Sequence, residues 1–312
     1  MSLQRVSTQN VKHKRKKSSL MHASTTENVI LHILFILMTI AFIYPVLMVV
    51  AVSFTDASAL YENGYRLIPA KLTLAAYKAA VGTGDILIAY RNTILSTVVG
   101  TVLGVMINLM YAYPLSRKDY KRRTFFTFFG YFTTLFSGGM VPWYILCTQV
   151  LHINNTFWAL FLPSLASVWN IIILRTFITT NIPSALIEAA KIDGCSEFGI
   201  FFRIIVPLSK AGVATIGLFT ALGIWNDFYL PMMLITKPNL YNLQYYLQII
   251  FLNIEALSKN NILSASQADA LKIPSETTRF AMCVLTMGPI LFVYPFFQKY
   301  FVKGMVVGSV KG

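Results

Sequence analysis

The stretch VILHILFILMTIAFIYPVLMVVAVSF, residues 29–54, contains no aspartate, glutamate, lysine or arginine. About 20 helical residues of this kind cross a hydrocarbon core about 30 Å thick. A basic tail, residues 1–28, precedes the run as in a secretory signal, but the run exceeds the roughly 7–15-residue apolar core of a cleaved signal peptide. We therefore predict that residues 29–54 form a retained membrane-spanning anchor.

Five further apolar runs follow, and the composition of the chain agrees with them. Of the 312 residues, 56% are hydrophobic and 12% are charged, whereas soluble domains average about 25% charged residues. Prolines and glycines inside the runs are tolerated in a membrane bundle, where neighbouring helices satisfy the freed backbone groups. The sequence predicts an all-α polytopic membrane protein, with a transmembrane domain over residues 29–312 that has six transmembrane helices at residues 29–54, 94–115, 124–151, 153–174, 211–236 and 280–297. Gly100 and Gly104 form a small-xxx-small pattern that predicts close helix packing.

The placement of the basic residues predicts the orientation of the bundle. The N-terminal tail, the loop after residue 115, residues 175–210 and the tail 298–312 together carry 18 of the 26 lysines and arginines. The segments 55–93 and 237–279 carry the other 8. Short loops rich in lysine and arginine remain in the cytoplasm, so we predict that both termini are cytoplasmic and that residues 237–279 form an external segment. The predicted location is the bacterial inner membrane.

Motifs for catalysis, metals and nucleic acids are missing from the sequence. No Gly-Lys dipeptide occurs, which excludes a Walker-type phosphate loop, and neither the zinc-protease motif nor the serine-hydrolase elbow is present. The basic clusters do not alternate with aromatic residues as in a strand-binding groove. Cys147, Cys195 and Cys283 are scattered, which indicates small buried side chains and no disulfide or metal site. We expect no catalytic residue, no bound metal or cofactor and no nucleic-acid partner.

The stretch IPSALIEAAKIDGC, residues 182–195, lies in the third predicted cytoplasmic region. Pro183 suits the first turn of a helix, and residues 186–192 follow as a short helix. Asp193 and Gly194 end it, because glycine adopts the left-handed terminal conformation at little cost. A second helix is predicted over residues 196–206, ending at Pro207. Two interpretations remain open: a knob that docks into a partner groove, or an amphipathic helix at the membrane surface.

The same stretch resembles the EAA motif of ABC-importer permeases. The resemblance rests on Glu188-Ala189-Ala190, Asp193-Gly194, Phe201, Ile204 and Pro207, whereas Cys195 and Ala211 replace the alanine and proline usual in that family. It implies the type I importer fold, in which residues 181–207 form a coupling helix that docks in a cleft of an ATPase subunit. The implied partners are a homologous permease subunit, two ATPase subunits that bind ATP and magnesium, a solute-binding protein and membrane lipid.

Two further stretches resemble the MalG-type carbohydrate permeases. The C-terminal sequence KGMVVGSVKG is similar to a tail that reaches the ATPase interface, which implies contacts from Gly304, Gly308, Val310, Lys311 and Gly312. Trp225-Asn226-Asp227-Phe228 with Pro231 resembles the fifth core helix of that type. The stretch 136–139, Phe-Ser-Gly-Gly, is similar to the branch for complex oligosaccharides such as pectin or alginate fragments. The implied function is a sugar- or oligosaccharide-translocating subunit that hydrolyses no ATP itself.

Two polar regions carry alternative interpretations. Asp227 is an ionisable group in a predicted span, and such groups face a partner, a cavity or a pathway. It could line the pathway or gate with Trp225 and Asn226, lie solvated at the interface, or contact sugar directly. In the external segment the resemblance implies contact between the binding protein and Asn260, Asn261 and Gln267, and the alternative is a solvated loop.

Three rival functions are weighed against the importer. An ion-coupled secondary transporter predicts buried ionisable groups at the midplane and often inverted repeats, whereas only Asp227 is a candidate and no repeat is evident. A membrane-embedded enzyme needs a polar catalytic cluster within the spans, which the sequence does not contain. An ABC permease for amino acids or phosphate is the third rival, and the C-terminal tail argues against it.

Overall fold

The computed structural model describes residues 25–82, 84–259 and 276–291. Within these residues the structure is helical, and one isolated antiparallel bridge joins Thr55 to Leu72. The all-α class predicted from the sequence is confirmed for this part of the chain. The chain divides into two compact units, residues 1–47 and 48–312, which are described separately.

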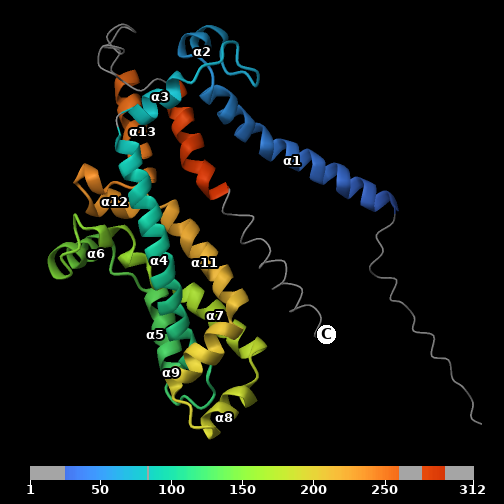
Figure 1. Ribbon diagram of the computed structural model, residues 1–312, viewed down its shortest axis with the longest axis vertical. Coiled ribbons are helices and arrows are strands. Elements are labelled where there is room, and N and C mark those ends of the chain that lie inside the picture. Colours follow the sequence, from blue (N-terminus) through green and yellow to red (C-terminus); the bar gives the residue numbers. More distant parts are fainter. Residues whose placement is uncertain (1–24, 83, 260–275, 292–312) are drawn as a thin grey trace, which may run out of the picture. The chain divides into compact units, whose positions relative to one another are not determined.

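The described part of the first unit is a single helix. Helix α1 spans Thr25–Ser53 and continues through Pro45 without a break (Figure 1). All its described side chains up to Leu47 are exposed. A long, uncharged helix whose apolar side chains all face outward is suited to lipid and not to water. By length and hydropathy α1 qualifies as a membrane span.

Three helices form the centre of the second unit. Helix α4 (Asp85–Ser116) packs against α11 (Lys210–Trp225) and α7 (Val168–Asn181) (Figure 1). Gly100 of α4 lies so close to α11 that an added Cβ would be 2.6 Å from Ile224 Cδ1 and 3.0 Å from Phe161 Cβ. At Gly104 the same atom would lie 3.2 Å from Thr220 Cγ2. The small-residue pattern predicted from the sequence is therefore a packing face.

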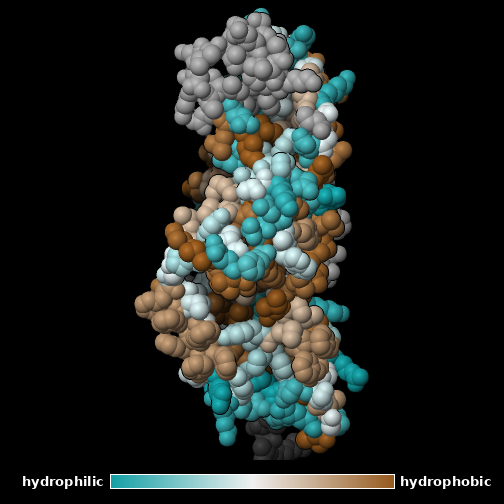
Figure 2. Space-filling view, turned by 90° about the vertical axis from the view of Figure 1, so that its left-hand side faces the viewer, coloured by the Kyte–Doolittle hydropathy of each residue, from teal (hydrophilic) through white to brown (hydrophobic). Residues whose placement is uncertain are grey.

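The two ends of the second unit carry different elements. At the upper end in Figure 1 lie α2 (Ala57–Asn63), α3 (Ala75–Gly82), α13 (Leu243–Lys259) and the helical residues 276–291. Ile86 and Ala89 of α4 pack there against Trp225, Leu243 and Met282. At the lower end lie α8 (Ser184–Ile192) and α9 (Glu197–Ile200). Hydrophilic residues gather at this lower end, and hydrophobic residues cover much of the surface above it (Figure 2).

Several predicted spans are broken helices. The run 124–151 forms α5 (Arg123–Leu135), a break at residues 136–139, then α6 (Met140–Ile145) and the π-helical turn η2 (Leu146–Val150). The run 153–174 begins with the 3-10 turns η3 (Phe157–Leu160) and η4 (Leu162–Ser164), which meet α7 at 56°. Within the run 211–236, helix α11 ends at Trp225, and the separate helix α12 (Tyr229–Leu234) follows. The short turn η6 (Pro238–Leu240) comes directly after the run.

The helix bounds therefore differ from the predicted ranges for physical reasons. Helix α4 begins nine residues before the predicted 94, because its first turns bury Ile86 and Ala89 in the protein and not in lipid. By length and composition, two helices in the described part of the chain qualify as spans, or up to four if each bent pair counts as one.

Asn108 holds the break that precedes α7. Its side chain is almost completely buried, and Nδ2 donates to the carbonyl oxygens of Gly104 at 2.6 Å and Leu165 at 2.8 Å. Its Oδ1 accepts from the backbone N–H of Ser167 at 2.9 Å. One amide thus satisfies both a donor and an acceptor that the missing helical turn leaves without partners.

The close packing at Gly100 predicts opposite effects for two glycine-to-alanine substitutions. Gly100→Ala should lower the free energy of unfolding by about 1–3 kcal/mol, because the new methyl group overpacks the α4–α11 contact. Gly223→Ala is the matched control, since nothing lies within 4 Å of its added Cβ, and it should be neutral or stabilise by up to about 1 kcal/mol. Thermal unfolding in detergent measures both, and equal shifts would contradict the packing role.

Candidate functional site

The lower end of the second unit carries a helix–turn–helix, which we call the elbow (residues 183–208). Helix α8 begins directly after Pro183, and the turn follows at Asp193 and Gly194. Gly194 has φ +78°, and its N–H donates to the Lys191 carbonyl at 3.0 Å. Ser196 caps α9 by accepting from the Gly199 N–H. The turn geometry predicted from the sequence is confirmed.

The second arm of the elbow is longer than predicted. Helix α9 continues through a π-helical turn, η5 (Phe201–Ile205), into α10 (Val206–Leu208), so Pro207 lies within the helix and not after it. The arm then meets α11 at an angle of 80°. Pro207 is the second residue of α10 and lies two residues before Ser209, where the arm ends and the chain turns into α11.

One face of the elbow packs on the bundle. Ile187 and Ala190 of α8 are buried together with Ile200, Phe201 and Ile205 of the second arm, against side chains of α4 and α7. Ala190 therefore supports the elbow from inside, and its part in ATPase coupling stays a prediction. Phe201 is likewise a core residue, with its ring 5.8 Å from that of Tyr113.

The other face of the elbow is exposed. It carries five of the seven residues of the EAA-like motif that are predicted to couple to an ATPase, namely Glu188, Ala189, Asp193, Gly194 and Pro207. Ile192 is 86% exposed at the end of α8, and Leu186 is also exposed. Ile192 and Leu186 thus add apolar surface to the exposed face of the elbow. Sequence reasoning did not single out Ile192, although an apolar residue directly before an Asp-Gly turn was a usable signal.

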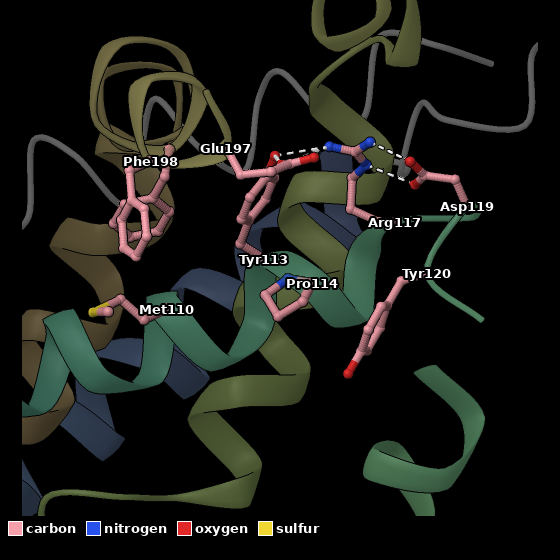
Figure 3. Close-up of a pocket in the computed structure, with 9 residues that line it drawn as sticks. Met110, Tyr113, Pro114, Arg117, Asp119, Tyr120, Glu197 and Phe198 are labelled. Carbon is pink, nitrogen blue, oxygen red and sulfur yellow. Dashed lines mark hydrogen bonds and ion pairs between the residues drawn. The ribbon is translucent and has the colours of Figure 1, made fainter. Parts of the chain in front are cut away.

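A cluster of four charged residues ties the elbow to the end of α4 (Figure 3). Arg117, which follows α4, donates from Nε to Asp119 Oδ1 at 2.9 Å and from Nη1 to Glu197 Oε2 at 3.3 Å. Lys191 Nζ lies 3.0 Å from Asp119 Oδ2 and 2.9 Å from Glu197 Oε1. Tyr113 completes the cluster by donating its hydroxyl to Glu197 Oε2 at 2.8 Å. Opposite charges alternate around the cluster, so α4, α8 and α9 are joined by polar bonds as well as by packing.

The cluster changes the acidity of its carboxyl groups. The hydrogen bond from Arg117 lowers the pKa of Asp119, outweighing the opposite effect of burial, and Lys191 adds to it. For Glu197, burial acts to raise the pKa, but hydrogen bonds from Lys191 and Tyr113 and the nearby positive charges lower it overall. Both carboxylates are more than half exposed, and surface ion pairs contribute little individually. The cluster therefore acts through its geometry as a network.

The residues predicted for a pathway or gate lie at the turn between α11 and α12. Trp225 is buried, and its Nε1 donates to the Thr286 carbonyl at 3.2 Å. Asn226 Oδ1 accepts from Gln244 Nε2 at 3.1 Å. Asp227 Oδ1 accepts from the N–H groups of Tyr229 at 2.8 Å and Leu230 at 3.2 Å, so it caps α12. Capping accounts for a carboxylate at this position, and the three interpretations of its role stay predictions.

The other predicted site residues lie outside the described residues: Asn260, Asn261 and Gln267 of the external segment, and Gly304, Gly308, Val310, Lys311 and Gly312 of the tail. Within the described ranges, no group of three or more histidine, cysteine, aspartate or glutamate side chains is arranged to hold a metal ion. Cys147 is buried, and Cys195 and Cys283 are partly buried free thiols.

Comparison with known proteins identifies the class. Residues 100–307 match the model of the family described as binding-protein-dependent transport system inner membrane component, and the chain belongs to this family. It is a membrane permease component, and ATP hydrolysis in such systems occurs in partner ATPases.

Particular relatives share most of the length of the chain. It is 39% identical over 273 residues to the protein LplC of Bacillus subtilis, covering 86% of this chain and 90% of the relative. It is 36% identical to the polygalacturonan/rhamnogalacturonan transport system permease protein YtcP of the same organism, covering 86% and 93%. Among solved structures, a bacterial ABC transporter involved in the import of the acidic polysaccharide alginate contains a similar chain, with TM-score 0.78 and 26% identity over 90% of this chain and 99% of that one.

The lowered carboxyl pKa values predict how the elbow responds to acid. A carboxylate with a lowered folded-state pKa stabilises the fold above its unfolded pKa of about 4, and this stabilisation is lost as the pH falls through the lower folded value. The elbow should therefore keep constant protection between pH 8 and 5 and lose it only below about pH 4. Asp119→Asn should lower the protection already at pH 7, because Arg117 and Lys191 lose a shared charge.

Hydrogen exchange of residues 184–208, corrected for intrinsic rates, measures this protection. Asp85→Asn at the other end of α4 is the matched control, because Asp85 forms no ion pair with any of the described residues. Unchanged exchange in Asp119→Asn at pH 7 would show that the cluster does not hold the elbow.

Proposed function

We propose that this chain is one of two homologous permease subunits of an ABC importer, which take up sugars or oligosaccharides delivered by a solute-binding protein. Membership of the family supports the import of a solute that a binding protein presents. The observation that carries the coupling role is the elbow. One of its faces is exposed, and the other is fixed to α4 and α7 by the core cluster and to the end of α4 by the four charges.

The proposed topology has six transmembrane helices and cytoplasmic termini. In this arrangement α1, α4, α11 and the bent pair ending in α7 cross the membrane, and α5 and the helical residues 276–291 contribute to the remaining two crossings. The distribution of elements supports it. The basic turn 117–123 and the elbow share one end of the second unit, and the segments 55–82 and 237–259, poorer in lysine and arginine, share the other.

In the proposed mechanism the elbow docks in a cleft of one ATPase subunit through its exposed face. ATP-driven approach of the two ATPase subunits moves the two elbows of the permease pair together. Because the elbow is tied to α4 as well as to its neighbours α7 and α11, the movement turns these helices as a rigid body, and the bundle opens alternately to the two sides. Solute binding outside and docking inside are then coupled reciprocally. ATP and magnesium belong to the ATPase subunits.

The proposed substrate class is an oligosaccharide that contains acidic sugars. One relative is named for polygalacturonan and rhamnogalacturonan transport, and the similar solved structure imports the acidic polysaccharide alginate. The residues expected to meet the binding protein, Asn260, Asn261 and Gln267, have amide groups suited to competing for sugar hydroxyls. These residues and the binding protein would then form hydrogen bonds with the hydroxyl groups of the same sugar ligand.

The substrate proposal predicts a binding preference. The solute-binding protein that stimulates ATP hydrolysis by the assembled importer should bind oligogalacturonate or a related acidic oligosaccharide at least about tenfold more tightly than the neutral oligosaccharide of equal length, because a carboxylate can accept charge-assisted hydrogen bonds. Titration calorimetry measures both affinities. Tighter binding of the neutral oligosaccharide would contradict the proposed acidic substrate class. Binding of an amino acid or phosphate instead of a sugar would overturn the sugar assignment.

The coupling role predicts that the Asp193–Gly194 turn is required for transport. Proline fixes φ near −65° and has no N–H, so Gly194→Pro should disrupt the turn and reduce uptake and binding-protein-stimulated ATP hydrolysis at least about tenfold, with membrane insertion intact. Gly64→Pro is a closely matched control, since Gly64 also has a positive φ of 69° and donates its N–H to a helix carbonyl, but lies at the other end of the unit.

Reconstituted vesicles with the binding protein inside or outside, and with ATP or an ion gradient as the energy source, provide the measurement. Wild-type coupling in Gly194→Pro would contradict the role of the elbow. Uptake driven by a gradient without ATP would instead favour an ion-coupled transporter.

A further inference from the structure

Two adjoining apolar grooves lie along the last turns of α4. The first has a volume of about 450 Å³ and lies between α4, the turn that follows it and α9 (Figure 3). The second, of about 360 Å³, lies between α4 and Phe126 of α5. Met110, Pro114 and Tyr120 line both. We call the two together the α4 groove.

The walls of the α4 groove are mainly apolar, and Arg117, Asp119 and Glu197 line one side of its first part. Phe198 of α9 is 70% exposed, and Met110 opposite it is 46% exposed. In Figure 3 the side chains of Met110 and Phe198 approach each other across one end of the first groove, and the ring of Tyr120 stands at the other end. Uncovered side chains of this kind favour an apolar occupant such as a hydrocarbon chain.

The charged residues beside the groove leave an excess of positive charge. Asp119 and Glu197 are neutralised by Arg117 and Lys191 in the cluster described above. On the same turn, next to Tyr120, the exposed Lys118, Lys121 and Arg122 have no acidic group within 4.0 Å among the described residues. The α4 groove thus combines an apolar floor with three adjacent uncompensated cations. An apolar helix of a partner subunit would fill the floor but leave these cations without a counter-charge.

We propose that the α4 groove binds an anionic phospholipid of the cytoplasmic leaflet, with an acyl chain against Met110, Pro114 and Phe198 and the phosphate at Lys118, Lys121 and Arg122. Basic residues next to the cytoplasmic end of a membrane helix attract anionic lipid, at about 1 kcal/mol for each lysine or arginine. The proposal rests on the proposed topology, which places this turn in the cytoplasm. Because Phe198 belongs to α9 and Met110 to α4, the lipid contacts both the elbow and the helix that the elbow moves.

The bound lipid therefore affects coupling as well as binding. With the groove filled, α9 and α4 share an apolar contact that the protein alone does not make at this point. Stimulated ATP hydrolysis and uptake should then be several-fold higher in vesicles that contain phosphatidylglycerol than in vesicles of phosphatidylcholine alone, with the same binding protein and ATP.

The test is lipid retention by the purified, complete importer. Native mass spectrometry after titration with phosphatidylglycerol or phosphatidylcholine should show a bound phosphatidylglycerol that the triple variant Lys118→Gln, Lys121→Gln, Arg122→Gln binds on the order of 100-fold more weakly, from about 1 kcal/mol per cation. The control triple variant Arg66→Gln, Lys78→Gln, Lys237→Gln removes three exposed cations from the other end of the unit and should retain the lipid.

A second variant tests the apolar part of the site without changing any charge. Met110→Trp fills the groove and should reduce retention of phosphatidylglycerol, whereas Leu103→Trp, an exposed position further along α4, should not. Equal retention by wild type and the Lys118/Lys121/Arg122 variant would overturn the proposal. So would equal affinity for phosphatidylcholine, or a cross-link from Met110→Cys to the partner permease, which would show that a protein surface fills the groove.

The lipid proposal and the proposed function fail in different ways. Loss of ATP-driven uptake in the wild-type importer in every lipid would contradict the function, while lipid retention by the wild type and its loss in the triple variant would still support the site. Uptake that is ATP-driven and independent of phosphatidylglycerol in wild type and in the triple variant alike would overturn the effect on coupling.

Discussion

The architecture of the second unit depends on satisfying backbone hydrogen bonds wherever a helix breaks. A hydrocarbon environment offers no water to an unpaired N–H or carbonyl group, so each break needs a partner from within the protein. Asn108 supplies one for the break before α7. At the end of α12, Asn155 Oδ1 accepts from the N–H groups of Thr236 and Lys237 at 2.7 and 3.1 Å, and Asn92 donates to the carbonyls of Asn239 and Tyr241. These asparagines allow a bundle of short, bent helices where continuous ones were expected, and bent helices can surround a path more readily than straight ones.

The elbow is held at this bundle in two physically different ways. Packing of Ile187, Ala190 and Phe201 against the bundle fixes the position of the elbow. The ion pairs among Arg117, Asp119, Lys191 and Glu197 fix its orientation relative to α4. Apolar packing is insensitive to direction, whereas a cluster of alternating charges is satisfied in few orientations. A part that transmits movement needs both properties. The family is non-catalytic, so in the proposed mechanism the chain contributes the stiffness of the connection between its elbow and its helices.

Local features were predictable from the sequence, and long-range ones were not. The Asp193–Gly194 turn and the close packing at Gly100 and Gly104 each follow from what glycine and its neighbours allow locally, and the family resemblance gave the class. The bends of 56° and 80°, by contrast, arise where helices pack on one another. The pairing of Asp119 with Lys191 joins residues far apart in the chain, and nothing in the spacing of either indicates the other. The burial of Ala190 was not predicted, because a helix as short as α8 does not show from its sequence which side is covered.

The bare side chain of Ile192 has a consequence for how such a subunit is made. In the proposed topology, a permease subunit that is not bound to its ATPase exposes the apolar side chain of Ile192 to the cytosol. Chaperones and proteases in the cytosol recognise such surfaces and act on unassembled chains. In the proposed docking, the ATPase subunit covers Ile192, so the contact proposed to transmit movement also removes this apolar side chain from the surface of an assembled subunit.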